Sequence, residues 1–304
     1  MKILIAGGAG FLGSYLSERF VSEGHNVHIL DNFASGLTEN IQKLKNDVTL
    51  LEQDVVSFQT RETYDMVINF ASRASRVEWE KYPVDVALSN SFGSKNLIEL
   101  SLKSNALYVY ASSSEVYGNP KVVPTPEDYI GCVSTTASRS PYDEGKRFGD
   151  ALTKAYEKQY GLRNIIIRFF NTYGPRMRGG DFYGRVVDRF IEQSINNKPI
   201  TVYGDGMQTR SFTYVSDTIN GVITAIEKGK EGEVYNIGND KETTIMNLAN
   251  IVRKLAKSDS EINFKPLPEN DPKRRGADIT KMRRLGWKPV VSLEDGISLT
   301  LKSR

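Results

Sequence analysis

The sequence predicts an α/β fold, in which a doubly wound parallel sheet is followed by a smaller C-terminal α/β domain. In the first half of the chain, short apolar runs alternate with amphipathic helical patterns. The apolar runs are continuous rather than alternating, which is typical of strands that helices cover on both faces. The first run leads into a glycine-rich turn and a helical pattern, the order in which many such sheets begin.

Six segments of four or five residues have the length and apolar character of buried strands. They are Lys2–Ala6, Asn26–Leu30, Val48–Leu51, Met66–Phe70, Leu107–Ala111 and Asn164–Arg168. Three longer segments between and after them predict helices, namely Phe11–Glu23, Val84–Lys103 and Tyr142–Tyr160. Ser140 and Pro141 mark the start of the last helix, because serine is a favoured cap and proline is favoured in the first turn.

After Arg168 the pattern changes to shorter elements and turn-rich loops. The segments Val186–Asn196, Val215–Lys228 and Thr244–Lys257 still predict helices. We therefore predict a first domain of residues 1–168 and a second domain of residues 169–304, from which some segments return to the first sheet.

Composition limits the class of protein. The chain has 304 residues and a formal net charge of +3, which is too small to indicate a nucleic-acid partner. Its single cysteine, Cys132, cannot form an internal disulfide, and no apolar run approaches the ~20 residues that span a membrane. We expect a cytoplasmic protein without a membrane anchor, and His25 and His28 lack the partners that a metal site needs.

The turn that follows the first strand has the pattern of a dinucleotide site. Gly7, Gly10 and Gly13 permit a tight turn and close approach of backbone to a pyrophosphate, and the helix that begins at Phe11 and Leu12 offers free N–H groups. Asp31 ends the second strand, with Asn32 after it. A carboxylate there binds the ribose 2′-hydroxyl and repels a 2′-phosphate, so the cofactor predicted for this Rossmann-type sheet is NAD rather than NADP.

A second group of residues predicts redox chemistry. Tyr142 and Lys146 lie four residues apart, so in a helix both side chains lie on one face. A phenol has an ordinary pKa of about 10, and we expect the ammonium of Lys146 to lower the pKa of Tyr142. Tyr142 would then accept a proton from an alcohol whose oxygen is held by the hydroxyl of Ser113. Beside a dinucleotide, these groups predict oxidation of an alcohol.

These motifs together resemble the extended short-chain dehydrogenase/reductase family, the NAD-dependent nucleotide-sugar epimerases, dehydratases and decarboxylases. The resemblance rests on the glycine turn Gly7–Gly13, the pair Tyr142 and Lys146, and the loop Asn171–Pro175, and it extends over essentially the whole chain. It implies bound NAD, a second domain that holds a nucleoside-diphosphate sugar, and a homodimer whose interface uses the helices Val84–Lys103 and Tyr142–Tyr160.

Several segments resemble the branch of the family that decarboxylates UDP-glucuronate to UDP-xylose. They are Ser114–Gly118, Tyr142–Arg147, Phe170–Met177 and Gln208–Arg210. Dehydratases usually have an Asp-Glu pair where this chain has Ser114 and Glu115, and many 4-epimerases lack the acid. The resemblance therefore implies oxidation at the sugar C4, loss of CO2 from the resulting 4-keto sugar, and return of the hydride.

The resemblance also implies a set of site residues. Tyr142, Lys146 and Ser113 would carry out the oxidation, and Glu115, directly or through water, would help to position and protonate C5. Asp54 would bind the adenine amino group. The residues expected at the UDP-sugar are Asn171, Arg185, Tyr203, Arg210 and Arg275. Arg185 and Arg210 are expected at the diphosphate, because guanidinium groups bind phosphate oxygens in pairs.

Two other functions remain open. A UDP-sugar 4-epimerase, acting on UDP-glucuronate or UDP-glucose, uses the same C4 oxidation but keeps the carboxylate. A non-catalytic NAD-binding regulatory protein would have the same fold, but the presence of both Tyr142 and Lys146 disfavours it.

Overall fold

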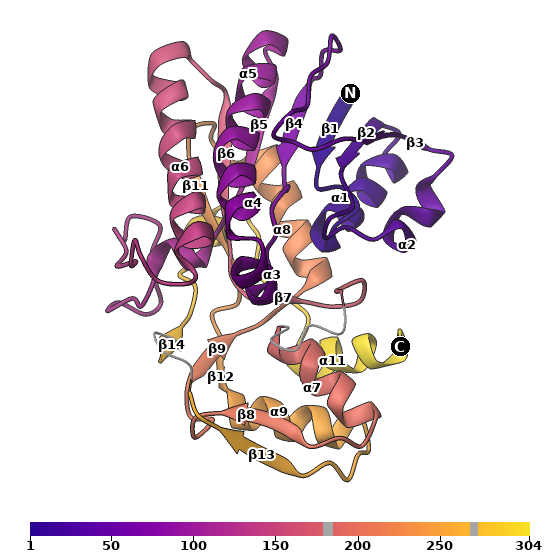
Figure 1. Cartoon of the computed structure of the whole chain (residues 1–304), viewed down its shortest axis with the longest axis vertical. Coiled ribbons are helices and arrows are strands. Elements are labelled where there is room, and N and C mark those ends of the chain that lie inside the picture. The colour runs from indigo at the N-terminus through magenta and orange to yellow at the C-terminus, as the bar shows by residue number, and fades with distance from the viewer. Residues whose placement is uncertain (179–184, 268–272) are drawn as a thin grey trace.

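Seven parallel strands form the central sheet, in the order β11-β6-β5-β4-β1-β2-β3 (Figure 1). The computed structural model describes residues 1–178, 185–267 and 273–304. The strands are β1 (Lys2–Ala6), β2 (Asn26–Asp31), β3 (Val48–Glu52), β4 (Met66–Asn69), β5 (Leu107–Ser113), β6 (Asn164–Phe169) and β11 (Val234–Ile237). The doubly wound parallel sheet is therefore confirmed, and the six predicted strands lie within two residues of their expected ends.

The seventh strand comes from the second half of the chain. β11 pairs with β6 in parallel, with Val234 opposite Ile166 and Ile237 opposite Phe169. Helix α8 (Val215–Lys228), which precedes it, packs on the same sheet. These two elements are the segments that return to the first sheet. The division at residue 168 itself stays a prediction.

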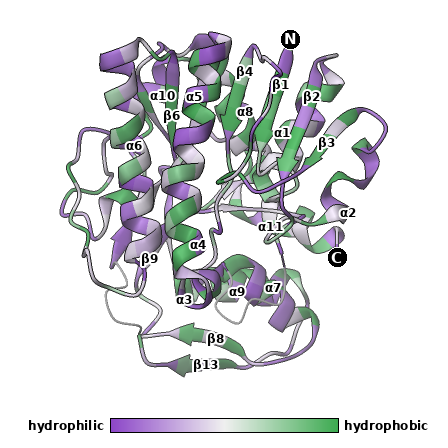
Figure 2. Cartoon of the chain, turned by 45° about the horizontal axis from the view of Figure 1, so that its top comes forward, coloured by the Kyte–Doolittle hydropathy of each residue, from purple (hydrophilic) through white to green (hydrophobic). Residues whose placement is uncertain are grey.

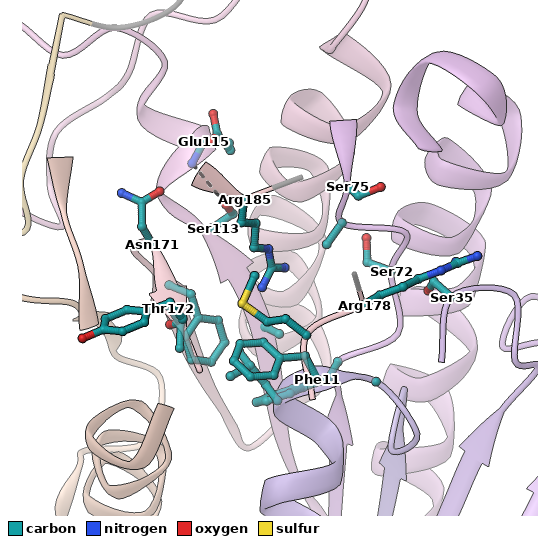
Figure 3. Close-up of a pocket in the computed structure, with 18 of the residues that line it drawn as sticks. Phe11, Ser35, Ser72, Ser75, Ser113, Glu115, Asn171, Thr172, Arg178 and Arg185 are labelled. Atoms are coloured by element: carbon teal, nitrogen blue, oxygen red, sulfur yellow. Dashed lines mark hydrogen bonds between the residues drawn. The ribbon is translucent and has the colours of Figure 1, made fainter. Parts of the chain in front are cut away.

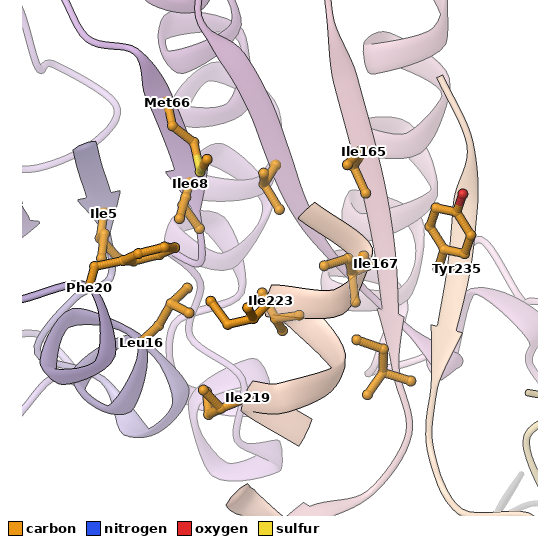
Figure 4. Close-up of a cluster of buried hydrophobic side chains, with 14 of the residues drawn as sticks. Ile5, Leu16, Phe20, Met66, Ile68, Ile165, Ile167, Ile219, Ile223 and Tyr235 are labelled. Carbon is orange, nitrogen blue, oxygen red and sulfur yellow. The ribbon is translucent and has the colours of Figure 1, made fainter. Parts of the chain in front are cut away.

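Helices cover both faces of the sheet. Side chains alternate along a strand, so Ile3 and Ile5 of β1 point to one face while Leu4 and Ala6 point to the other. α1 (Phe11–Ser22) and α8 pack on the first face (Figure 4), and α5 (Ser94–Ser104) and α6 (Ser140–Tyr160) pack on the second. The strands between these layers are mostly hydrophobic (Figure 2), as their continuous apolar runs predict.

The predicted helix Val84–Lys103 is interrupted. It consists of α4 (Pro83–Leu88), a π-helical turn (Ser89–Gly93) and α5. The buried Asn90 side chain donates a hydrogen bond to Val86 O at 2.8 Å, and such side chains compete with the regular backbone ladder. The turn lies where α6 passes closely, because a Cβ on Gly145 would lie 3.0 Å from Cβ of Asn90. This contact brings α6, which carries Tyr142 and Lys146, close against the π-helical turn.

Helix α6 begins at Ser140, two residues earlier than the predicted range, and Pro141 lies in its first turn. Ser140 does not cap the helix. Its hydroxyl donates instead to Ser134 O at 2.6 Å, because the loop before the helix passes close to it. The helix ends at Tyr160, and Gly161 follows with a left-handed φ of 71°, the usual helix-ending conformation.

The second half forms a smaller core from short helices and small sheets. Its elements are β7 (Thr172–Tyr173), α7 (Val186–Ile195), β8 (Ile200–Tyr203), β9 (Thr209–Ser211), β10 (Thr213–Tyr214), β12 (Glu242–Thr244), α9 (Ile245–Leu255), β13 (Ile262–Lys265), β14 (Arg274–Arg275), α10 (Thr280–Arg284) and α11 (Leu293–Lys302). The first half adds α2 (Thr38–Ile41), α3 (Arg76–Lys81) and short 3-10 turns at Gln42–Leu44 and Ser114–Tyr117. Within the described ranges, each helix is too short or too polar to cross a membrane.

Candidate active site

The carboxyl ends of the parallel strands open onto two adjoining cavities of about 420 and 330 Å³. Open α/β sheets bind their ligands at this edge. The larger cavity extends toward the second half of the chain, and Figure 3 shows the side chains around it. The residues that line both cavities are Gly7, Gly10, Ser35, Phe70 and Ser72. The glycine turn therefore lies where the two cavities meet.

The glycine turn has the close backbone packing that the sequence predicts. Gly7 has a left-handed φ of 78°, and its carbonyl accepts a hydrogen bond from Gly10 N at 3.0 Å. A Cβ on Gly13 would lie 2.1 Å from Gly7 O, so no other residue fits there. The turn places the first N–H groups of α1 at the cavities, which suits a phosphate group.

Asp31 lies at the end of β2 and holds the glycine turn in place. Its carboxylate accepts hydrogen bonds from Ala9 N and Phe33 N, each at 2.9 Å. Burial raises the pKa of Asp31, and these two hydrogen bonds oppose that rise. The side chain lines the smaller cavity, as a residue that binds an adenosine ribose would.

Asn32 and Asp54 lie together at the far end of the smaller cavity. Asn32 Nδ2 donates to one carboxylate oxygen of Asp54 at 2.7 Å, and Val56 N donates to the other at 2.8 Å. The structure thus places Asp31, expected at the ribose, and Asp54, expected at the adenine, in one cavity with Asn32, a further candidate cofactor-binding residue.

Tyr142, Lys146 and Ser113 meet in the larger cavity. Tyr142 and Lys146 lie on one face of α6, and Ser113 ends β5. Lys146 Nζ donates to Ala111 O at 2.8 Å and lies 5.8 Å from the centre of the Tyr142 ring. All three side chains are buried.

Burial is the largest influence on the pKa values of Tyr142 and Lys146. It raises the pKa of Tyr142 to about 12, against a hydrogen bond with Ser113 that lowers it. Burial also lowers the pKa of Lys146 to about 7, partly offset by the charge of Asp150. The pKa of Tyr142 is therefore raised, whereas the sequence analysis expects Lys146 to lower it, because the loss of solvent around the phenol is the largest effect.

Glu115 lies between two arginines at the rim of the same cavity. It forms ion pairs with Arg139, next to α6, and with Arg275 of β14, whose Nη2 donates to Glu115 Oε2 at 2.9 Å. Burial raises the pKa of Glu115, but Arg275 and Arg139 lower it more, so the pKa lies below its ordinary value. Arg139 Nε also donates to Asp143 Oδ2 at 3.0 Å.

Of the five residues expected at the substrate, all but Tyr203 line the larger cavity. Arg185, Arg210, Arg275 and Asn171 line the larger cavity. Arg185 lies 5.6 Å from the Phe11 ring centre and points into the cavity (Figure 3), and Arg210 and Arg275 are buried. Tyr203 is the exception. It lies on β8, where the Arg189 guanidinium stacks at 5.1 Å from its ring, and it is not among the described residues that line either cavity.

Trp79, Arg139 and Arg178 are among the lining residues that the sequence analysis missed. Trp79 stacks on Tyr142, Arg139 bridges Glu115 and Asp143, and Arg178 crosses toward the first half of the chain. Each belongs to a loop or a short helix without a motif, so nothing in the local pattern indicated it. The described residues contain no cluster of three His, Cys, Asp or Glu that could hold a metal ion.

Residues 3–238 match the model of the NAD dependent epimerase/dehydratase family. The chain belongs to this family. UDP-glucuronic acid decarboxylase 1 of Danio rerio is 40% identical over 304 residues, which cover 99% of this chain and 72% of that protein. The family membership predicted from the motifs is thus confirmed.

Two solved epimerase structures are similar over the full chain. One is the UDP-glucuronic acid 4-epimerase from Bacillus cereus in complex with UDP-glucuronic acid and NAD, with a TM-score of 0.90, 30% identity, and coverage of 100% of this chain and 98% of that one. The other is the UDP-glucose 4-epimerase from Thermotoga maritima with UDP-glucose, with a TM-score of 0.90, 31% identity and the same coverage. This epimerase/dehydratase family member is an NAD-dependent enzyme, as the sequence predicts, and each of these two solved relatives is in complex with a UDP-sugar.

Proposed function

We propose that the protein decarboxylates UDP-glucuronate to UDP-xylose through a 4-keto intermediate. The observation that carries this proposal is the position of Glu115, held by Arg139 and Arg275 in the cavity that contains Tyr142 and Ser113. A charge cluster of this kind suits a substrate that carries a carboxylate beside the reacting carbon. The 40% identity to a protein named UDP-glucuronic acid decarboxylase supports the same reaction.

The residues present fit NAD. The glycine turn and the start of α1 would hold its diphosphate, Asp31 its adenosine ribose, Asp54 its adenine, and Lys146 its nicotinamide ribose. Bound NAD would accept a hydride from the sugar C4 and later return it. Because the cofactor ends each cycle as it began, it can remain bound between turnovers.

Tyr142 takes the proton of the C4 hydroxyl, whose oxygen Ser113 holds. Because burial raises the pKa of Tyr142 to about 12, this proton transfer requires the positive charges of a protonated Lys146 and of bound NAD+ to favour the ionised phenol. Once C4 is a ketone, the carboxylate on C5 lies β to it, and the C–C bond breaks with its electrons entering an enolate while CO2 leaves. Tyr142 returns its proton to the C4 oxygen when the ketone is reduced again.

The ion pairs of Glu115 with Arg139 and Arg275 decide which role we propose for it. A carboxylate whose pKa is held low by two arginines is a poor proton donor near neutral pH. Glu115 therefore acts by holding Arg275 toward the sugar carboxylate and by orienting a water that protonates C5. Arg185 and Arg210 bind the UDP diphosphate.

The first test is proton NMR of the purified protein with UDP-glucuronate and NAD+. We expect a UDP-pentose with loss of the carboxylate. Tyr142→Phe should lower the rate by about 10²–10⁴-fold, the usual contribution of a general base. Glu115→Gln should allow oxidation at C4 but slow CO2 release.

The similarity to a UDP-glucuronic acid 4-epimerase makes 4-epimerisation the second candidate. UDP-galacturonate without CO2 release in the NMR experiment would establish this function and contradict decarboxylation. No turnover of any UDP-sugar, together with tight NAD binding, would favour the regulatory alternative.

We also propose a homodimer through α4, its π-helical turn and α6. These neighbouring elements expose Val84, Phe92 and Phe148, which are 66%, 56% and 49% accessible. Exposed apolar side chains on adjoining helices are typical of an interface. Phe92→Glu with Phe148→Glu should convert a dimer to a monomer in multi-angle light scattering. Leu299→Glu, a similarly exposed position on α11, serves as the control and should leave the mass unchanged.

A further inference from the structure

The segment Pro175–Arg178 of the second half is fastened to helices of the first half. Tyr15 Oη of α1 donates to Pro175 O at 3.3 Å, and the Arg176 guanidinium lies 4.1 Å from the centre of the Tyr15 ring. Arg176 also forms an ion pair with Glu18 at 2.5 Å. Its backbone φ of 66° is left-handed, a conformation that a non-glycine residue keeps only when its surroundings hold it. The segment is therefore firmly positioned.

From this anchored segment, Arg178 reaches across the cavities. Its Nη1 donates to Ala34 O, after β2, at 3.4 Å and lies 3.6 Å from Glu78 Oε1 of α3. Ala34 lines the smaller cavity and Glu78 the larger one, and Figure 3 shows Arg178 near Ser35. The contacts of Arg178 with Ala34 and Glu78 are long, and its side chain is half exposed. Breaking these contacts to bind another acceptor therefore costs little free energy.

Ser35, which follows Ala34 in the chain, belongs to the junction of the cavities. Ser35 and Ser72 line both cavities, together with the glycine turn. A dinucleotide with its adenosine at Asp31 and its nicotinamide near Tyr142 has its diphosphate at this junction. The glycine turn offers that diphosphate N–H groups but no full positive charge.

The other charges at the smaller cavity do not balance the diphosphate. Among its described lining residues the charged side chains are Asp31, Asp54, Asp85 and Arg73. Arg73 is paired with Glu78 at 3.3 Å and with Asp85 at 3.4 Å. Arg178, whose contacts with Ala34 and Glu78 are long, is therefore available to a diphosphate at the junction.

We propose that Arg178 is a further cofactor-binding residue, which closes over the diphosphate of the dinucleotide and retards its release. The guanidinium binds phosphate oxygens on the side of the diphosphate opposite the glycine turn. The inference rests on the NAD site of the proposed function but not on which sugar reaction occurs there. Slow release caused by Arg178 would keep the same cofactor molecule bound while it accepts a hydride from the sugar and transfers it back.

The test measures binding rather than turnover. The variants are Arg178→Ala, Arg178→Lys, and Arg19→Ala as a control, since Arg19 is an exposed arginine of α1 paired with Glu23. NAD+ dissociation constants are measured by calorimetry, and dissociation rates by stopped-flow fluorescence. We expect Arg178→Ala to raise the dissociation constant and rate about tenfold, the size of one hydrogen-bonded contact to a charged group. Arg178→Lys should lie between, and Arg19→Ala should match the wild type.

A ligand series identifies the group that Arg178 contacts. ADP and ADP-ribose contain the diphosphate and should lose affinity as NAD+ does in Arg178→Ala, whereas adenosine should bind wild type and variant equally. Unchanged NAD+ binding, or an equal loss for adenosine, would overturn the proposal. If Arg178 governs NAD+ binding while UDP-glucuronate is not converted, the inference stands and the proposed reaction fails.

Discussion

The indole of Trp79 lies flat on the ring of Tyr142, with 4.4 Å between ring centres and 17° between ring planes. The stack is buried together with Val86. Trp79 Nε1 donates to Arg73 O at 3.0 Å, which fixes the orientation of the indole. Trp79 thus covers one face of the proposed catalytic phenol and excludes water from it.

Removing the indole should change the proton affinity of Tyr142. Burial raises the pKa of Tyr142 to about 12, so Trp79→Ala, which admits water, should bring that pKa back toward 10. The acid limb of the kcat–pH profile should move to lower pH, while kcat at the optimum falls about tenfold because the ring is less well positioned. Trp79→Phe should keep most of the wild-type profile. Loss of rate in Trp79→Ala without any movement of the limb would contradict this role.

The buried Lys146 should make stability depend on pH. Unfolded, this lysine binds its proton up to about pH 10.5, but burial lowers the folded-state pKa to about 7. Between these values the unfolded state binds more protons, so wild-type stability rises with pH. Lys146→Met removes that rise. The variant should therefore exceed the wild type in free energy of unfolding most at about pH 6.5, and the difference should shrink by about pH 9.5. Urea unfolding at each pH measures the free energy of unfolding, with Lys43→Met at an exposed lysine as the control. A stability gain that does not depend on pH would contradict the burial of a titrating Lys146.

Arg139 should stabilise the fold chiefly when its two carboxylates are ionised. Burial and the charge of Glu115 together raise the pKa of Asp143 to about 7, and the charge of Arg139 opposes that rise. In Arg139→Gln the folded carboxylates hold protons more tightly, so the loss of stability grows with pH. We expect about 2–4 kcal/mol near pH 8 and clearly less near pH 5.

Chemical denaturation at both pH values measures this loss. Arg19→Gln breaks an exposed pair with Glu23 and should cost less than about 0.5 kcal/mol at either pH. A larger loss for Arg139→Gln at low pH than at high pH would show that the ion pairs are not its cause.

Asp31 should set the choice of dinucleotide. Its carboxylate would bind a ribose hydroxyl and repel a 2′-phosphate, and it also holds Ala9 N and Phe33 N. Asp31→Asn should weaken NAD+ about tenfold and raise the affinity for NADP+ relative to NAD+. Competitive titration of the two dinucleotides measures the ratio. An unchanged ratio would mean that Asp31 only supports the glycine turn.

The local sequence pattern was enough to predict much of the fold. The six predicted strands and helix α1 follow from continuous apolar runs, glycine punctuation and helical periodicity, which are properties of neighbouring residues. β11 has no comparable signal, because the short run Val234–Ile237 becomes a strand through its pairing with β6. The π-helical turn also depends on a distant partner, since Gly145 of α6 packs on Asn90 there.

By itself the sequence determined the doubly wound sheet, the glycine turn, and the pairing of Tyr142 with Lys146, because each depends on residues a few positions apart. Only the tertiary structure decided which distant side chains complete the site. It placed Trp79 on Tyr142, Arg139 and Arg275 on Glu115, and Arg178 between Ala34 and Glu78. It also reversed the expected direction of the pKa of Tyr142, because desolvation depends on everything packed around a group and spacing along the chain does not reveal it.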